Sequence, residues 1–305
     1  MAMEVTAPVP RAVPTQTAAL VPLLGLLWGF NWVAVRICLT EIPPWTLRAA
    51  GFAAGTLALY AYLRVRGKSL EVPRRHWLRL VVVGLLSITF YNLLSAFAQL
   101  SASTTRSSVL SYTMPIWAVI FARIVVGERV DRRRALGLGL GIAGLLSLGW
   151  PILAAGEFSI GLVWAILSGV SWAAGSVVLK RYPIDAGALT IAWWQLMLAV
   201  PVTTAGMLVF EGVPELRPLQ TATIWAFIYH AILAQAVATT LWFTILEALP
   251  TGIASIGSLL VPAVGVLGAT AFLGERPTTG DLLGLAFIVA ASAVVLVRLP
   301  PERRT

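Results

Sequence analysis

Ten long apolar runs constrain the fold of this 305-residue chain more than any other feature. A membrane-spanning helix needs about 20 mainly apolar residues, because the hydrocarbon core is about 30 Å thick and each residue rises about 1.5 Å. The runs lie at roughly 17–38, 44–63, 79–100, 104–126, 134–152, 159–179, 187–210, 221–244, 251–273 and 281–298. The short linkers between them leave no room for a soluble domain. We therefore predict an all-α integral membrane protein with ten transmembrane helices.

The composition supports this fold class and excludes others. Charged side chains make up 11% of the chain and hydrophobic ones 58%, whereas an ordinary soluble domain has about 25% charged residues. A soluble enzyme and a disordered protein are therefore disfavoured. The net charge of +9 comes from basic residues that flank apolar runs, so we expect a lipid bilayer as partner and no nucleic acid. The single cysteine, Cys38, excludes an intramolecular disulfide and a Cys-rich metal site, and no metal is expected.

The basic residues also predict the orientation of the chain. With ten spans, both tails fall on one side, and that side receives 17 of the 22 Lys and Arg residues. The other side receives Arg36, Arg48, Arg106, Arg217 and Arg276. The positive-inside rule then places both termini in the cytoplasm. Residues 1–16 lack the features of a signal peptide, so we interpret them as a flexible tail before a retained helix, and residues 299–305 as a second tail.

The chain contains two copies of one unit. Shifted by 147 residues, Pro115 meets Pro262, and Gly127-Glu128-Arg129 meets Gly274-Glu275-Arg276. Shifted by 140 residues, Gly29 and Trp32 meet Gly169 and Trp172. Each copy, 17–152 and 153–298, holds five spans. Because five is odd, the copies must cross the membrane in opposite directions. Such inverted repeats are typical of secondary transporters, whose substrate site lies between the repeats near mid-membrane.

These motifs resemble the drug/metabolite transporter superfamily, in its ten-helix EamA-type branch. Each first helix carries Gly-x-x-Trp, and each fourth helix carries a Pro twelve residues before Gly-Glu-Arg. Within the branch, the chain is most similar to bacterial exporters of aromatic and other neutral amino acids (YddG-type). The resemblance implies export of metabolites across the inner membrane with no cofactor. We expect small neutral substrates, alternating access of the two halves and no required oligomer. The chain agrees in lacking the phosphate-loop motif Gly-x-x-x-x-Gly-Lys-Ser/Thr.

His230 is the sharpest candidate for a substrate contact, because polar groups inside a membrane are costly. It lies about nine residues into its span, which is about 13 Å deep, and its unperturbed pKa is near 6.5. It could bind a substrate carboxylate or titrate during transport. The alternative is a neutral imidazole satisfied by a neighbouring helix. Gln235 is also a candidate, but about 140° separates the two on an α-helix, so we expect them on different stripes.

Other spans carry further candidate cavity residues. These are Asn31, Trp32, Tyr91, Asn92, Ser95, Tyr112, Trp164 and Trp172. Trp32 and Trp172 are repeat mates and could form a paired aromatic wall, with ordinary packing as the alternative. Pro115 and Pro262 each permit a bend, and a gating hinge and a structural kink are equally open.

The remaining charged residues are assigned to helix ends. Arg106 has Ile253 as its repeat mate, so symmetry does not require it. It could attract a carboxylate at the outer mouth, with snorkelling to the interface as the alternative. Arg48 is expected to snorkel to the interface. Glu128 and Glu275 are expected to make helix-end or inter-loop contacts.

Gly51 and Gly55 form a small-residue spacing that lets helices approach closely.

Two other functions remain as alternatives. A nucleotide-sugar or drug carrier of the same superfamily is the closer one, although a phosphate ligand would favour more basic residues in the cavity. A membrane-embedded enzyme would need a catalytic constellation, and we find none within the spans. We therefore do not expect this protein to be an enzyme. No carboxylate lies deep in a span, which leaves facilitated diffusion or proton exchange linked to His230.

Overall fold

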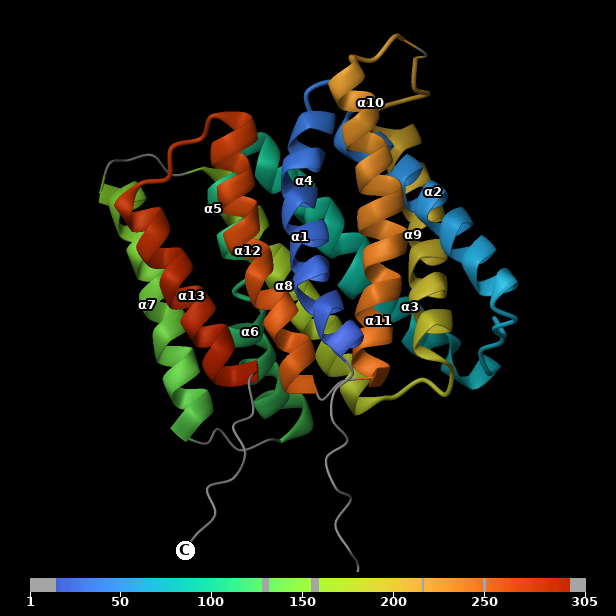
Figure 1. Ribbon diagram of the computed structural model, residues 1–305, viewed down its shortest axis with the longest axis horizontal. Coiled ribbons are helices and arrows are strands. Elements are labelled where there is room, and N and C mark those ends of the chain that lie inside the picture. The colour runs from blue at the N-terminus through green and yellow to red at the C-terminus, as the bar shows by residue number, and fades with distance from the viewer. Residues whose placement is uncertain (1–14, 128–131, 155–158, 216, 249–250, 297–305) are drawn as a thin grey trace, which may run out of the picture.

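The ten predicted spans appear as helices in a computed structural model (Figure 1). It describes the chain except for residues 1–14, 128–131, 155–158, 216, 249–250 and 297–305. Seven spans are single helices: α1 (Thr15–Cys38), α2 (Pro44–Val65), α7 (Arg132–Ala154), α8 (Ile160–Arg181), α9 (Ala188–Phe210), α12 (Thr251–Leu273) and α13 (Thr279–Leu296). The predicted all-α architecture is therefore confirmed over the described residues.

The third, fourth and eighth spans are divided into segments. The third consists of α3 (Trp77–Gly84), η2 (Leu85–Phe90) and α4 (Tyr91–Ser101), after the short η1 (Arg74–His76). The fourth consists of α5 (Thr104–Ser111), α6 (Met114–Phe121) and η3 (Ala122–Val126). The eighth consists of α10 (Thr221–Ile228), η4 (Tyr229–Val237) and α11 (Ala238–Ala248). The segments η2, η3 and η4 are π-helical.

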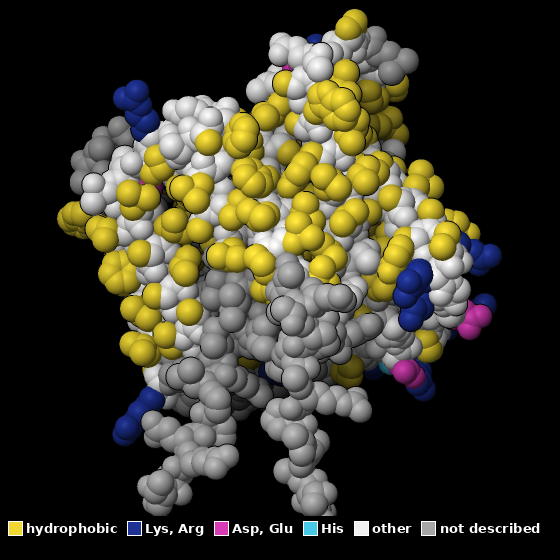
Figure 2. Space-filling view, viewed as in Figure 1, with side chains coloured by type: hydrophobic (Ala, Val, Ile, Leu, Met, Phe, Trp, Pro, Cys, Tyr) yellow, Lys and Arg dark blue, Asp and Glu magenta, His cyan; other side chains and the backbone are white. Residues whose placement is uncertain are grey.

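The outside of the bundle suits a bilayer. By length and composition, six helical stretches of the described chain can cross a membrane: 20–38, 74–101, 104–125, 160–181, 188–210 and 221–242. Three shorter apolar helices lie at Ala135–Ser147, Leu260–Leu273 and Thr279–Ala291. Hydrophobic side chains spread over the middle of the face seen in Figure 2, where Lys and Arg lie toward its margins. Every backbone group within the hydrocarbon must be satisfied internally, which helices achieve.

The two ends of the described bundle lie on one face, which we call the tail face. The start of α1 and the end of α13 both lie there, at the bottom of Figure 1. At the opposite, far face, the Cys38 thiol at the end of α1 lies 3.9 Å from the Thr223 carbonyl oxygen near the start of α10. The Ser159 hydroxyl, just before α8, donates to the Ser101 carbonyl at the end of α4. Helices α1 and α8, the first of each half, therefore run in opposite directions.

The helix contacts come in sets related by this duplication. Helix α1 packs along α12, and its repeat mate α8 packs along α5 and α6, which are the mate of α12. Helix α2 packs on its own mate α9, and α7 on its own mate α13. The third span packs on α8, and its mate, the eighth span, packs on α1. This pattern is that of two halves related by a pseudo-two-fold axis.

The two halves differ where their prolines lie. The fourth span breaks at Tyr112 and Thr113, and Pro115 then occupies the first turn of α6, where a missing N–H costs little. Its mate Pro262 lies inside the unbroken α12, where it removes a backbone hydrogen bond. The predicted bend is thus a helix break in one half only, and a gating role stays a prediction.

Candidate functional site

Arg48 is buried at the centre of a polar cluster, although the sequence predicted that it would snorkel to the interface. Its side chain lies one turn into α2 and the residue is 1% exposed. Nη1 lies 3.3 Å from Nε2 of His230, and Nη2 donates to Oγ of Ser95 at 3.2 Å. The snorkelling prediction is wrong because α4, α9 and η4 pack against α2.

The charge of Arg48 has only neutral partners within the described chain. The ion pairs there are Arg75 with Asp185 and Arg106 with Asp281, so no described carboxylate lies within 4.0 Å of Arg48. Its Nε is buried without a hydrogen-bond partner. Arginine keeps its charge in proteins. The bundle therefore encloses a cation that no described acidic side chain balances.

His230 is fully buried beside Arg48 and is held by Asn31. Nδ1 of the imidazole lies 2.8 Å from Oδ1 of Asn31. Because that oxygen can only accept, Nδ1 carries the proton, and Nε2 accepts from Arg48. A neutral imidazole satisfies both contacts, which is the alternative left open for this residue.

Ser95 completes the cluster from the third span. Its hydroxyl accepts from Arg48 and donates to the carbonyl of Asn92 at 2.8 Å. The Asn92 side chain instead donates to the Ile88 carbonyl at 2.9 Å. We call Asn31, Arg48, Ser95 and His230 the Arg48 cluster. It joins four spans, three from the first half and one from the second.

The π-helical geometry of η4 changes which residues share a face. A Cβ on Gly51 of α2 would lie 2.8 Å from Nε2 of His230, and one on Gly55 would lie 2.9 Å from Cβ of Gln235. His230 and Gln235 therefore both face α2. The prediction of different stripes is wrong because hydrogen bonds in a π-helix join residues five apart and place them on one side. The predicted close approach at Gly51 and Gly55 is confirmed.

The aromatic candidates divide into two groups. Trp32 and Tyr112 belong to one buried cluster, against which Trp164 packs. Trp172 instead packs edge-on against Tyr91, with 5.0 Å between ring centroids. No described ring contact joins Trp32 to Trp172, and the paired wall stays a prediction. Ser171, the neighbour of Trp172, also contacts the third span, where its hydroxyl donates to the Leu86 carbonyl.

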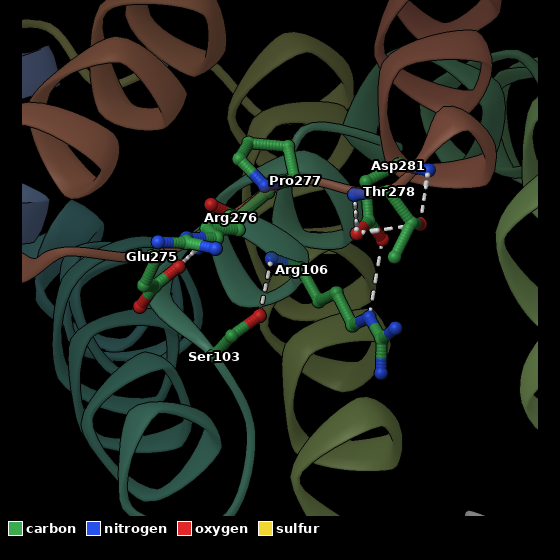
Figure 3. A pocket seen from close by; sticks show the side chains of 8 residues that line it. Ser103, Arg106, Glu275, Arg276, Pro277, Thr278 and Asp281 are labelled. Atoms are coloured by element: carbon green, nitrogen blue, oxygen red, sulfur yellow. Dashed lines mark hydrogen bonds and ion pairs between the residues drawn. The ribbon is translucent and has the colours of Figure 1, made fainter.

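Arg106 lies at the far face as predicted, but it is paired. Its Nε lies 3.1 Å from Oδ1 of Asp281, whose other oxygen accepts from the backbone and hydroxyl of Thr278 (Figure 3). These residues line a cavity of about 140 Å³ between α5 and the start of α13. The guanidinium of Arg106 is thus already paired with a carboxylate of the chain, and a role in attracting a substrate carboxylate stays a prediction. Sequence reasoning missed Asp281 as its partner.

Glu275 caps a helix of the other half. Its carboxylate accepts from the backbone N–H groups of Thr104, at 2.7 Å, and Thr105, at 2.9 Å, at the start of α5. This confirms the predicted helix-end contact, whereas its mate Glu128 lies outside the described residues. Glu211 caps α2 in the same way, through Trp45 and Thr46. A carboxylate at a helix N-terminus satisfies backbone donors and opposes the helix dipole.

Comparison with known proteins assigns the family. The model of the EamA-like transporter family matches residues 16–150 and again residues 159–297, once for each half. The chain belongs to the EamA-like transporter family. It is therefore a multi-pass membrane transporter and not an enzyme. No group of three or more His, Cys, Asp and Glu able to hold a metal occurs among its described residues.

Several bacterial relatives share most of the length of this EamA transporter. The chain is 27% identical over 290 residues to the "Uncharacterized inner membrane transporter YedA" of Escherichia coli K12, covering 92% of each. It is 25% identical over 277 residues to a "Probable amino-acid metabolite efflux pump" of the same organism, covering 88% of this chain and 90% of that one. It is 24% identical over 265 residues to the "Uncharacterized transporter YoaV" of Bacillus subtilis, covering 86% and 90%. These relatives support the EamA branch and not the YddG-type exporters in particular.

A solved structure has the same fold. It is titled "Crystal structure of protein" and superposes with a TM-score of 0.66 at 22% sequence identity. The match covers 92% of this chain and 98% of the other. At this identity the likeness concerns the fold alone.

Proposed function

We propose that this EamA transporter exports small neutral metabolites, aromatic and other apolar amino acids in particular, by alternating access around a mid-membrane site. The observation that carries the proposal is the buried Arg48 cluster. Its side chains sit where the first half meets the eighth span of the second half. Substrate sites of inverted-repeat transporters lie at such a boundary.

The chemistry of this region suits a neutral zwitterion with an apolar side chain. Asn31, Ser95 and His230 offer neutral hydrogen-bonding groups, and no described acidic side chain lies among them. Trp32, which lies next to Asn31 on α1, packs in one cluster with Tyr112 of the fourth span. Aromatic rings of this kind supply apolar contact area for a hydrophobic side chain. The relative named as a probable amino-acid metabolite efflux pump adds support for this substrate class.

We further propose that the tail face is cytoplasmic and that the membrane is the inner, or plasma, membrane. Exposed basic residues gather on that face at the end of α2 and before α3; they are Arg64, Arg66, Lys68, Arg74 and Arg75. The positive-inside rule supports this orientation, and one relative is named an inner membrane transporter. One chain without a cofactor is sufficient in this proposal, and the transport is facilitated diffusion.

Counterflow in proteoliposomes tests the substrate class. Vesicles loaded with unlabelled substrate receive the same labelled compound outside, with phenylalanine, threonine, glutamate and a uridine-diphosphate sugar tested separately. The proposal expects labelled phenylalanine or threonine to accumulate transiently, and glutamate and the nucleotide sugar to remain outside. Exchange of the nucleotide sugar alone would support the other carrier class. No exchange of any amino acid would overturn the proposal.

A further inference from the structure

We propose that Arg48 is the anchor for the carboxylate of the transported metabolite, and that Ser95 and His230 position its guanidinium. The inference rests on the proposed function and names the chemical group by which the substrate is held. It requires a small molecule with one carboxylate, and it excludes amides and alcohols of the same shape.

The first step is the missing counter-charge. A buried charge is costly unless it is paired, and arginine in membranes pairs with acids or lines a substrate path. The described chain pairs Arg75 and Arg106 with aspartates, although the side chains of both arginines are partly exposed. It surrounds the most deeply buried of these arginines with a serine and an imidazole instead. The deficit is one negative charge, which a carboxylate supplies.

The second step is the geometry of the donors. A guanidinium has five N–H donors in a planar fork that matches a carboxylate. Two described contacts use Nη1 and Nη2, to His230 and Ser95, while Nε has no partner. A carboxylate can therefore still bind along the fork in a bidentate, charge-assisted arrangement.

The third step is positioning. His230 cannot rotate without losing its 2.8 Å contact to Asn31, so its Nε2 stays an acceptor facing Arg48. Ser95 is likewise fixed by the carbonyl of Asn92. The fork is thus held in one plane before any ligand arrives, which reduces the entropy lost on binding.

The fourth step is access. Arg48 is closed off here by side chains of the third and eighth spans, and both spans contain π-helical turns. Such turns are frequent at functional sites in helices. A carboxylate therefore reaches the guanidinium when the spans around Arg48 rearrange, as alternating access requires of a mid-membrane site.

The test compares ligands that differ only at the carboxylate. Wild-type proteoliposomes catalyse counterflow of labelled phenylalanine, and unlabelled phenylalanine or phenylalaninamide competes outside. We expect the amide to compete about 10- to 100-fold more weakly, the loss expected for a hydrogen bond to a charged group. Arg48→Met should weaken competition by unlabelled phenylalanine by a similar factor, and Arg48→Lys should weaken it by less. Equal competition by acid and amide in the wild type would overturn the anchor while leaving the proposed function intact.

Two controls keep the test decisive. Arg217→Gln removes one positive charge from an exposed residue that precedes α10 at the far face. This variant should leave phenylalanine exchange unchanged. Thermal unfolding of purified wild type with 3-phenylpropionate or 3-phenylpropanol needs no transport and no folded variant. We expect only the acid to raise the unfolding midpoint of the wild type. If the wild type exchanges no amino acid, the proposed function fails, but the unfolding experiment still tests the role of Arg48. If 3-phenylpropionate does not raise the unfolding midpoint, Arg48 is not a carboxylate anchor.

Discussion

Gly51 of α2 lies directly against the imidazole of His230. A Cβ at Gly51 would come within 2.8 Å of Nε2 and 3.0 Å of Cδ2 of that ring. The absence of a side chain at this position lets α2 and η4 approach closely enough for Arg48 to contact His230. A packing feature of membrane helices, the small-residue spacing Gly51-x-x-x-Gly55, therefore also builds the polar cluster.

Substitution of Gly51 should separate these two helices. We expect Gly51→Ala to destabilise the protein by about 1–3 kcal/mol, because the ring it meets is held by Asn31 and overpacking costs that amount. The matched control is Gly139→Ala, where a Cβ would meet nothing within 4 Å and should cost little. Thermal unfolding in detergent measures both variants. An unchanged midpoint for Gly51→Ala would contradict the observed packing.

Replacement of His230 should slow transport without altering its dependence on pH. The imidazole already has a proton on Nδ1 and faces a donor at Nε2, so a second proton there would point at Arg48. We expect His230→Gln to reduce phenylalanine counterflow about 10-fold through loss of positioning, by the cost of a hydrogen bond to a charged group. The ratio of rates at pH 6 and pH 8 should equal that of the wild type. A changed ratio would show that His230 carries the proton dependence.

Removal of a helix-capping charge should lower stability at the far face. Glu275 bonds two backbone N–H groups of α5 across the boundary between the halves. We expect Glu275→Gln to lower the free energy of unfolding by roughly 0.5–2 kcal/mol, the usual value of an N-cap. Glu215→Gln, at an exposed residue of the same face, should have no measurable effect. Equal stabilities of the two variants would argue against a capping role.

The two prolines should respond differently to substitution. Pro262 interrupts the hydrogen bonding of α12, so Pro262→Ala should restore a bond, raise the unfolding midpoint and slow phenylalanine counterflow several-fold. Pro115 lies in the first turn of α6, so Pro115→Ala should leave the midpoint nearly unchanged. Counterflow and thermal unfolding are measured on the same preparations. If the Pro262→Ala variant is more stable and transports at the wild-type rate, Pro262 produces a structural kink and has no role as a gating hinge.

The spans and the duplication were predictable because they depend on local composition and on matched motifs. Apolar runs must be about 20 residues long to cross the membrane, and Gly274-Glu275-Arg276 repeats an earlier motif at a fixed offset. The prediction for Glu275 also succeeded, because a polar residue at a helix end has few possible roles.

The Arg48 cluster was only partly predictable. Asn31, Ser95 and His230 stood out as polar residues within spans, but Arg48 was assigned to the interface by its distance from a helix end. Burial depends instead on which helices cover that end, which no single span reveals. The shared face of His230 and Gln235 was hidden by the assumption of α-helical periodicity. Asp281 was missed because its contact with Arg106 joins residues far apart in the chain.

Phenylalanine counterflow into matched proteoliposomes of wild type and Arg48→Met tests the central claim most directly. Both preparations are reconstituted at equal protein content, loaded with unlabelled phenylalanine and given labelled phenylalanine outside. The account predicts a transient accumulation of label in wild-type vesicles and a much smaller one in Arg48→Met vesicles. Equal accumulation in both would contradict the role of the cluster, and none in wild type would contradict the proposed substrate class.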